Sequence, residues 1–133
     1  MIEFVDVYKA RNAVDVLFDL LKERDPAANI SHQKMPTFEE HSNFFASKPY
    51  FAWYLLKVNG EYAGSVYLSK NREIGVFIFK QYQGKGYGKA AVVKLMNIVG
   101  GSFLANVAPG NDKSKRLFES LGGKAIQVTY KLG

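Results

Sequence analysis

The chain has 133 residues, of which 47% are hydrophobic and 23% charged, the composition of a globular protein. It contains no cysteine, which excludes disulfides, thiolate nucleophiles and cysteine-ligated metal centres. The longest apolar run, residues 50–56, is too short to cross a bilayer, and the first residues lack the pattern of a signal peptide. We therefore expect one cytoplasmic domain over residues 1–133 that does not bind membranes.

The formal net charge of +6 is unevenly distributed along the chain. Residues 1–79 carry nine Lys/Arg and ten Asp/Glu, whereas residues 80–133 carry nine Lys/Arg and only two Asp/Glu. Such an asymmetry predicts that the second half meets an anion, with a solvated basic surface as the alternative.

Hydrophobic periodicity and turn signals predict ten elements. In chain order they are a strand at 2–7, a helix at 12–25, a helix at 37–47, strands at 50–58, 61–69 and 73–79, a helix at 88–98, a strand at 102–107, a helix at 111–121 and a strand at 125–132. Asn59-Gly60 is a strong hairpin signal between the second and third of these strands. The order β-α-α-β-β-β-α-β-α-β predicts an α/β domain with a mixed sheet.

Polar residues mark the predicted helix starts. Asn12 and Asn111 stand where a side chain can cap the first free amides of a helix. Thr37 and Glu40 have the spacing of a capping box. These signals predict helices that begin directly after Asn12, Thr37 and Asn111.

The most informative segment is residues 81–90, Gln-Tyr-Gln-Gly-Lys-Gly-Tyr-Gly-Lys-Ala. Gly84, Gly86 and Gly88 alternate between a predicted strand and an apolar helix, so the backbone can turn tightly and approach a ligand. No Ser, Thr, Asp or Asn stands at the helix start, which leaves the first amides without a side-chain cap. Uncapped amides at a helix N-terminus bind anions, and phosphate is their usual ligand.

Two common nucleotide motifs do not match this segment. A Walker loop requires Ser or Thr after its lysine, and Lys89 is followed by Ala90. The dinucleotide motif Gly-x-Gly-x-x-Gly fails because its last position falls on Lys89 or Ala91. The predicted phosphate ligand is therefore of another kind.

The pattern Gln83-x-x-Gly86-x-Gly88 resembles the Gln/Arg-x-x-Gly-x-Gly/Ala signature of the GNAT acetyltransferase superfamily. In that family the loop holds the pyrophosphate of acetyl-coenzyme A. The predicted element order also follows the family from residue 2 to about residue 132. The resemblance implies the GNAT fold, acetyl-CoA as acetyl donor, and no metal.

A second GNAT-like signature lies in the helix after Asn111. The residues that resemble it are Asn111, Ser114, Leu117, Phe118 and Leu121-Gly122, with Gly123 in place of the usual Phe. Another departure is the short tail after Gly123, which leaves the acceptor site open or completed by a partner subunit. We expect a monomer or a homodimer.

The resemblance assigns a set of residues to the cofactor. They are Phe77, Ile78 and Phe79 of the strand before the loop, Gln83, Gly84, Lys85, Gly86, Tyr87, Gly88 and Lys89 of the loop, and Asn111, Ser114 and Phe118. The backbone of residues 77–79 would pair with pantetheine, with the Ile78 amide near the thioester oxygen. Asn111 has a simple N-cap as its alternative role.

Catalysis by a GNAT enzyme needs a base for the attacking amine. Glu73 is the candidate, since it begins the strand that lines the implied active site; an exposed strand-edge carboxylate is the alternative. Many family members carry a tyrosine acid at the position of Phe118, which has no proton to give. Tyr130 or Ser114 could replace it, or the thiolate could leave without a protein acid.

His32 and His41 lie in the segment where GNAT proteins build the acceptor site, and they form no recognised metal motif. The predicted function is acetyl transfer to a small-molecule primary amine, and residues 30–41 faintly resemble enzymes that acetylate nucleotide-linked amino sugars. Protein N-termini, polyamines and antibiotics are alternative acceptors. A non-catalytic acyl-CoA-binding protein is the alternative function. Nucleic-acid binding is not expected, because Tyr82 and Tyr87 lie within the loop.

Overall fold

The computed structural model describes residues 1–24 and 35–133 of the chain. The elements are β1 (Glu3–Asp6), α1 (Ala13–Glu23), α2 (Phe38–Ala46), β2 (Ala52–Val58), β3 (Glu61–Leu68), β4 (Glu73–Ile78), the 3₁₀ helix η2 (Lys80–Tyr82), α3 (Tyr87–Val99), β5 (Leu104–Ala105) and α4 (Asp112–Ser120). No helix in the described part of the chain is long and apolar enough to span a membrane. The predicted α/β class is confirmed.

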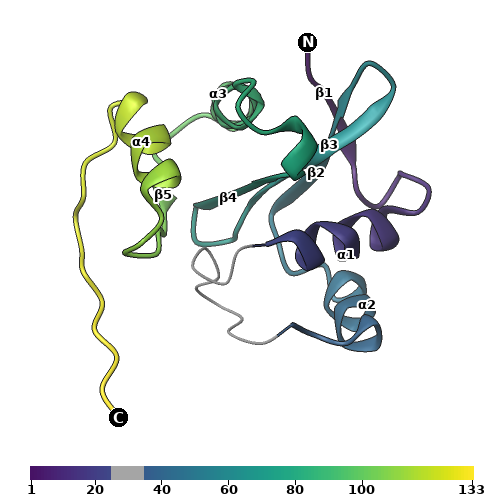
Figure 1. The fold of residues 1–133 in the computed structure, drawn as a ribbon, viewed down its shortest axis with the longest axis horizontal. Coiled ribbons are helices and arrows are strands. Elements are labelled where there is room, and N and C mark those ends of the chain that lie inside the picture. The colour runs from purple at the N-terminus through teal and green to yellow at the C-terminus, as the bar shows by residue number, and fades with distance from the viewer. Residues whose placement is uncertain (25–34) are drawn as a thin grey trace.

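The five strands form one mixed sheet in the order β1-β2-β3-β4-β5 (Figure 1). Strands β1 to β4 are antiparallel to their neighbours, and β5 joins β4 in parallel. Asn59 has a φ of 50° and Gly60 a φ of 82°, the left-handed pair of a tight two-residue hairpin turn. The hairpin and the antiparallel strands predicted around it are confirmed.

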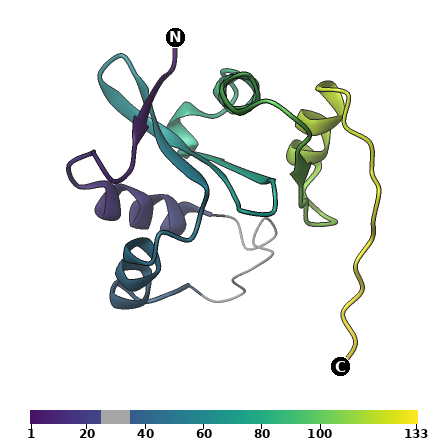
Figure 2. The ribbon, with the colours of Figure 1, turned by 180° about the vertical axis from the view of Figure 1, so that it is seen from behind.

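Helices cover both faces of the sheet, with α1 and α2 on one face and α3 on the other (Figures 1 and 2). Leu55 and Leu56 are adjacent in β2 and fully buried, yet they belong to separate clusters with Leu17 of α1 and Leu95 of α3. Successive strand side chains point to opposite faces, so a strand covered on both sides is a continuous apolar run. Each buried leucine contributes roughly 1.5–3 kcal/mol.

The helix starts agree with the sequence signals at two of three positions. Thr37 Oγ1 accepts from the Glu40 amide at 3.1 Å, and Glu40 Oε1 accepts from the Thr37 amide at 2.8 Å, which is the predicted capping box. Asn111 Oδ1 accepts from the Ser114 amide at 3.2 Å and caps α4. Asn12 has a left-handed backbone and makes no capping bond, so the prediction of a side-chain cap there is wrong. Capping requires an extended backbone at that position.

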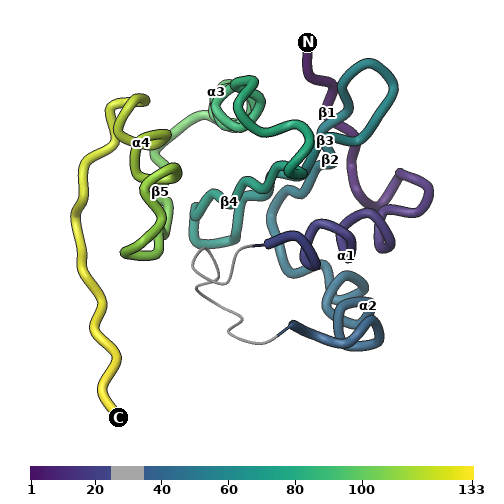
Figure 3. The backbone as a smooth tube through the Cα atoms, viewed as in Figure 1, coloured from purple at the N-terminus to yellow at the C-terminus, as the bar shows by residue number. Residues whose placement is uncertain are grey.

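Two predicted strands differ in the structure. The strand predicted at 102–107 is reduced to the two residues of β5, and the strand predicted at 125–132 does not form. An extended segment becomes a strand only where its backbone finds a partner, and the tail after α4 runs away from the sheet (Figure 3). Its alternating apolar side chains, Ile126, Val128, Tyr130 and Leu132, are 73–92% exposed.

The C-terminal cap of α4 sets the direction in which residues 124–133 leave the helix. Gly122 has a φ of 85°, its amide donates to the Glu119 carbonyl at 3.0 Å, and the Gly123 amide donates to the Phe118 carbonyl at 2.9 Å. This is the Schellman arrangement of a helix C-terminus. A Cβ at Gly123 would lie 2.7 Å from the Phe118 carbonyl oxygen. The tight closure therefore gives a steric reason for glycine at this position.

Candidate active site

The loop from Gln83 to Gly88, here called the glycine loop, turns the chain from β4 and η2 into α3. Gly84 and Gly86 have φ values of 80° and 81°, a conformation that glycine adopts without strain. Gly86 is the N-cap residue of α3 and no side chain caps the helix. A Cβ at either glycine would meet nothing within 4 Å, so the space beside the loop is open. The predicted uncapped helix N-terminus is confirmed.

Side-chain contacts fix the glycine loop against the rest of the fold. Gln83 Nε2 donates to the Ile78 carbonyl at 3.0 Å, and Gln83 Oε1 accepts from Lys113 Nζ of α4 at 3.4 Å. The Tyr82 hydroxyl donates to Glu61 in the β2–β3 hairpin, and this hydrogen bond raises the pKa of Tyr82. Gln83 and the neighbouring Tyr82 therefore tie the loop to three elements. Among the hydrogen bonds of the described residues, the only loop amide that donates is that of Gln83, to the Lys80 carbonyl at 3.2 Å.

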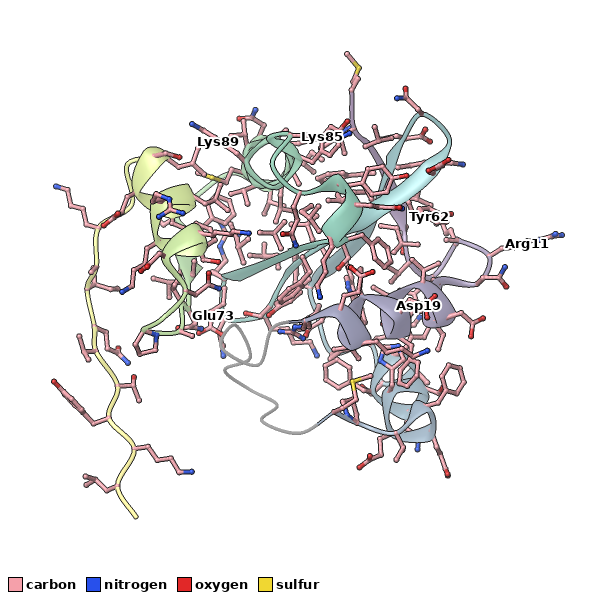
Figure 4. The ribbon with its side chains drawn as sticks, viewed as in Figure 1. Arg11, Asp19, Tyr62, Glu73, Lys85 and Lys89 are labelled. Atoms are coloured by element: carbon pink, nitrogen blue, oxygen red, sulfur yellow. The ribbon has the colours of Figure 1, made fainter. Side chains whose placement is uncertain are left out.

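Two positively charged side chains lie at the N-terminus of α3. Lys85 and Lys89 are exposed and lie with the beginning of α3 in Figure 4. Neither takes part in a salt bridge within the described residues. Free amides, the helix dipole and unpaired ammonium groups all favour an anion here. The donor set fits a phosphate or pyrophosphate group.

Beyond Ile74, one edge of β4 has no neighbouring strand among the described residues as β4 runs toward the glycine loop. Its pairing with β5 covers only Glu73 with Leu104 and Ile74 with Ala105. The Phe79 amide donates to Ala63 of β3 at 2.9 Å, so by strand alternation the peptide groups of Phe77 and Phe79 face β3. These two backbones are engaged in the sheet, contrary to the assignment of all three residues 77–79 to pantetheine.

The same alternation turns the Ile78 peptide group toward the open edge, where its carbonyl already accepts from Gln83 Nε2 at 3.0 Å. The Val76 peptide group faces that edge as well. The sequence analysis did not identify Val76, although counting two residues back from Ile78 gives this position. An extended ligand lying beside β4 would thus find peptide groups at alternate residues.

Glu73 stands at the beginning of β4, where β5 still pairs with it. Its Oε2 accepts from Asn106 Nδ2 at 2.9 Å. Its amide donates to Ser69 Oγ at 3.0 Å, and its carbonyl accepts from the Ser69 amide at 2.8 Å. These bonds fix both the backbone and the carboxylate of Glu73. The sequence analysis missed Asn106 because a residue beyond a two-residue strand carries no local signal.

Glu73 also lines a cavity of about 470 Å³ between α1, α2 and the sheet, here called the aromatic cavity. Its walls include Phe44, Tyr50, Trp53, Tyr67 and Phe77. The rings of Tyr50 and Tyr67 are stacked with centroids 3.9 Å apart. Burial raises the pKa of both hydroxyls, which are therefore neutral at physiological pH. The volume suits a small molecule.

Arg24, directly after α1, contributes a positive charge to this cavity. Its guanidinium carbon lies 3.9 Å from the centre of the Phe77 ring. Its Nε is buried and has no hydrogen-bond partner among residues 1–24 and 35–133. No sequence pattern singled out Arg24, because the ring and the cavity that surround it come from distant segments.

His41 is buried, with 4% of its surface exposed, and lines the aromatic cavity. Its Nε2 lies 3.0 Å from the Val14 carbonyl, to which the neutral ring donates. Burial lowers the pKa of His41, and the hydrogen bond to Val14 opposes this only in part. His41 therefore joins α2 to α1 from a position at the cavity wall. His32, the other predicted acceptor-site histidine, lies outside the described residues.

The remaining predicted site residues lie in three different places. Asn111 and Ser114 form the cap of α4. Phe118 is half-buried against the α3-side core. Tyr130 is 84% exposed in the tail and belongs to no strand, so the strand expected to carry it as an acid is absent.

Two further observations concern where else a ligand or a metal ion could bind. A second hollow of about 510 Å³, near Asp19 and Tyr62 in Figure 4, is lined by neither the glycine loop nor Glu73. In the described part of the chain, no group of three or more His, Cys, Asp or Glu residues could hold a metal ion.

The fold and the glycine loop define a class of acetyltransferase. The chain belongs to the acetyltransferase (GNAT) family, whose family model matches residues 14–123. No curated protein sequence matches the chain.

Solved structures share the fold. A domain from Methanocaldococcus jannaschii DSM 2661 is 24% identical, with a TM-score of 0.76 over 96% of this chain and 90% of that one. An N-acetyltransferase from Staphylococcus aureus Mu50 is 17% identical, with a TM-score of 0.67 over 92% of this chain and 81% of that one. A protein from Salmonella typhimurium solved with its cofactor acetyl-CoA is 19% identical, with a TM-score of 0.66 over 92% and 78%.

Proposed function

We propose that this protein transfers the acetyl group of acetyl-CoA directly to a primary amine. One observation carries the proposal: the uncapped N-terminus of α3 and the open edge of β4 lead to a cavity that contains Glu73. A donor site and an acceptor site thus meet along one strand. The fold also resembles that of the Salmonella protein solved with acetyl-CoA.

The chain offers suitable groups for each part of this cofactor. Amides of residues 84–88, with Lys85 and Lys89, would hold the pyrophosphate. The peptide groups of Val76 and Ile78 would pair with the pantetheine arm. Bound acetyl-CoA would supply an acetyl thioester, a carbonyl group with a thiolate leaving group.

Glu73 is the proposed general base. Its carboxylate, held by Asn106, would accept a proton from the acceptor ammonium directly or through a water molecule. The Ile78 amide would donate to the carbonyl oxygen as negative charge develops on it, an effect worth about 2.7–4 kcal/mol where such donors have been removed. Phe118 cannot act as an acid, and a thiolate can leave near neutral pH without one.

The finer identity of the acceptor stays a prediction of the sequence. A nucleotide-linked amino sugar is the acceptor suggested by residues 30–41, of which residues 30–34 lie outside the described residues. A peptide N-terminus is the alternative amine. The non-catalytic alternative predicts acyl-CoA binding without turnover.

Two measurements test the proposal. Acetyl-CoA should raise the melting temperature, since a ligand that binds only the native state stabilises it, by about 2.7 kcal/mol at a hundred times its Kd. Steady-state release of coenzyme A with a panel of amines, checked by the mass of the acetylated product, should then show turnover. A thermal shift with no turnover on any amine would favour the non-catalytic alternative, and no thermal shift would contradict both.

A further inference from the structure

The aromatic cavity is lined by a positive charge, that of Arg24, which no salt bridge within the described residues neutralises. The buried Nε of Arg24 has no acceptor there. A guanidinium keeps its proton at neutral pH even when burial lowers its pKa, as it does here. Arg24 is half-buried, and a partly buried charge with an unpaired donor is costly, so a counter-charge bound in the cavity would offset that cost.

The surroundings of Arg24 show where that counter-charge would come from. The ring of Phe77 covers one side of the guanidinium, at 3.9 Å from its carbon. Tyr50 and Tyr67 line the cavity, and their electrostatic interaction with Arg24 partly offsets the lowering of its pKa by burial. Both hydroxyls are neutral, so neither supplies a counter-charge. The end of α1 adds the partial negative charge of the helix dipole and the Glu23 carboxylate, but Glu23 accepts from the Lys80 amide at 2.8 Å and lines the other hollow. The space still open beside Arg24 is the cavity itself.

Two carboxylates line the same cavity: Glu40 of α2, which accepts from the Thr37 amide at 2.8 Å in the capping box, and Glu73 of β4. Glu73 is one of its lining residues and is fixed by Asn106 at 2.9 Å. A cavity that presents Arg24 and Glu73 from separate elements matches a molecule with an anionic and a cationic end. Aromatic side chains between them provide apolar walls.

We propose that the acceptor is an amino-acid-like zwitterion whose carboxylate binds Arg24, whose ammonium faces Glu73, and whose apolar side chain contacts the aromatic walls. A carboxylate is the best match because a guanidinium can donate two parallel hydrogen bonds to it. The volume of about 470 Å³ accommodates a molecule of this size. This inference rests on the proposed acetyltransferase function and names an acceptor different from the nucleotide-linked amino sugar that residues 30–41 suggest.

The test uses matched acceptors that differ only in the carboxylate: phenylalanine, phenylalaninamide and 2-phenylethylamine, with the corresponding leucine series. We expect kcat/KM for the acid to exceed that of each neutral analogue at least tenfold. The amide is the stricter control, because its less basic amine is more readily available for attack.

Arg24→Met should remove this preference by raising KM for the acid far more than KM for 2-phenylethylamine, so that the two kcat/KM values become nearly equal. Arg24→Lys should keep part of it, because an ammonium retains the charge without the paired geometry. Arg11→Met is the matched control: Arg11 is exposed and points outward on the side of the molecule away from Glu73 (Figure 4). A purely structural Arg24 predicts instead that Arg24→Met lowers the melting temperature and affects all acceptors equally.

Binding is measured separately by thermal shift with the two amino acids, with and without coenzyme A. An Arg24-dependent shift supports the inference, even if acetyl-CoA fails to bind and the proposed activity is lost. Intact acetyl-CoA binding with no shift from either amino acid would overturn the inference and leave the acetyltransferase proposal standing. Equal use of acids and neutral analogues by the wild-type protein would overturn it as well.

Discussion

The glycine loop and the aromatic cavity are two ends of one proposed site, and they are built in opposite ways. The loop is a continuous segment that offers backbone amides, and two left-handed glycines give it its shape. The cavity combines side chains from α1, α2, β2, β3 and β4. A backbone site can hold the same cofactor group in any sequence that keeps the turn. A side-chain site can change its acceptor without changing the fold.

The comparison predicts that the largest loss of kcat comes from a substitution in the aromatic cavity. Glu73→Gln keeps the shape and the contact with Asn106 but removes the base, so kcat should fall by roughly 10²–10⁴. Acetyl-CoA binding should be nearly unchanged. Coenzyme A release measures the first effect, and the thermal shift with acetyl-CoA measures the second.

Glu39→Gln on α2 is the control for this change of charge, since Glu39 is exposed and does not line the cavity. It should behave as wild type. Wild-type turnover in Glu73→Gln at neutral pH would show that another group takes the proton, with His41 the next to test.

At the loop end we expect loss of binding. Gly86→Val should abolish the thermal shift with acetyl-CoA, because a side chain at a φ of 81° strains the turn and projects into the open space beside it. The lost ligand stabilisation would be about 2.7 kcal/mol at a hundred times the Kd. Differential scanning fluorimetry with and without acetyl-CoA measures it.

Gly60 provides a matched control for backbone strain. It has a φ of 82° and, like Gly86, no atom within 4 Å of a built Cβ, but it lies in the β2–β3 hairpin. Gly60→Val and Gly86→Val should lower the melting temperature of the free protein similarly, by strain of about 1–3 kcal/mol. Equal ligand shifts in both variants would show that the glycine loop is only a turn.

Phe118 lies on α4, packs against the α3-side core and does not line the aromatic cavity, so its substitution should have smaller effects. Phe118→Tyr should leave kcat within a few-fold, since a hydroxyl adds little where no acid is needed. Phe118→Ala should weaken stability by less than the roughly 3–5 kcal/mol of a fully buried phenylalanine, because Phe118 is half-buried. A hundredfold gain of turnover in Phe118→Tyr would instead show that the natural protein lacks a working acid and would favour the non-catalytic alternative.

The smallest expected effect concerns His41 and pH. Because burial lowers its pKa in the folded protein, the unfolded chain binds a proton more readily as the pH falls through the ordinary value of 6.5. The stability contributed by neutral His41 is therefore complete above that value and is lost at lower pH. Between pH 7.5 and 5.0 the melting temperature of wild type should fall by a few degrees more than that of His41→Gln. Equal pH profiles would show that His41 titrates normally.

Local signals predicted local structure well. The capping box at Thr37 and Glu40, the Asn59-Gly60 turn and the uncapped start of α3 each depend on a few consecutive residues, and all three are confirmed. The cap expected at Asn12 is wrong because a left-handed backbone, which the residue type permits, does not place the side chain for capping. An asparagine can adopt either backbone conformation, so the residue type alone did not decide whether Asn12 caps α1.

Non-local pairing was less predictable. Residues 125–132 alternate in polarity as a strand does, but a strand needs a partner, and the cap of α4 directs this segment away from the sheet. Similarly, which peptide groups of β4 face the open edge follows from the hydrogen bond of Phe79 to Ala63. That bond joins two strands and has no counterpart in the spacing of β4 alone.

The sequence by itself determined helices α1 to α4, the β2–β3 hairpin, the uncapped start of α3 and, through the resemblance of its loop to the GNAT signature, the acetyltransferase class, because each depends on contiguous residues. The tertiary structure alone decided that β4 has an open edge at Val76 and Ile78, that Asn106 holds Glu73, and that Arg24 lines the aromatic cavity with an Nε that no described residue accepts from. These features join side chains far apart in the chain. Their positions follow from the packing of helices on a twisted sheet, which no short stretch of sequence encodes.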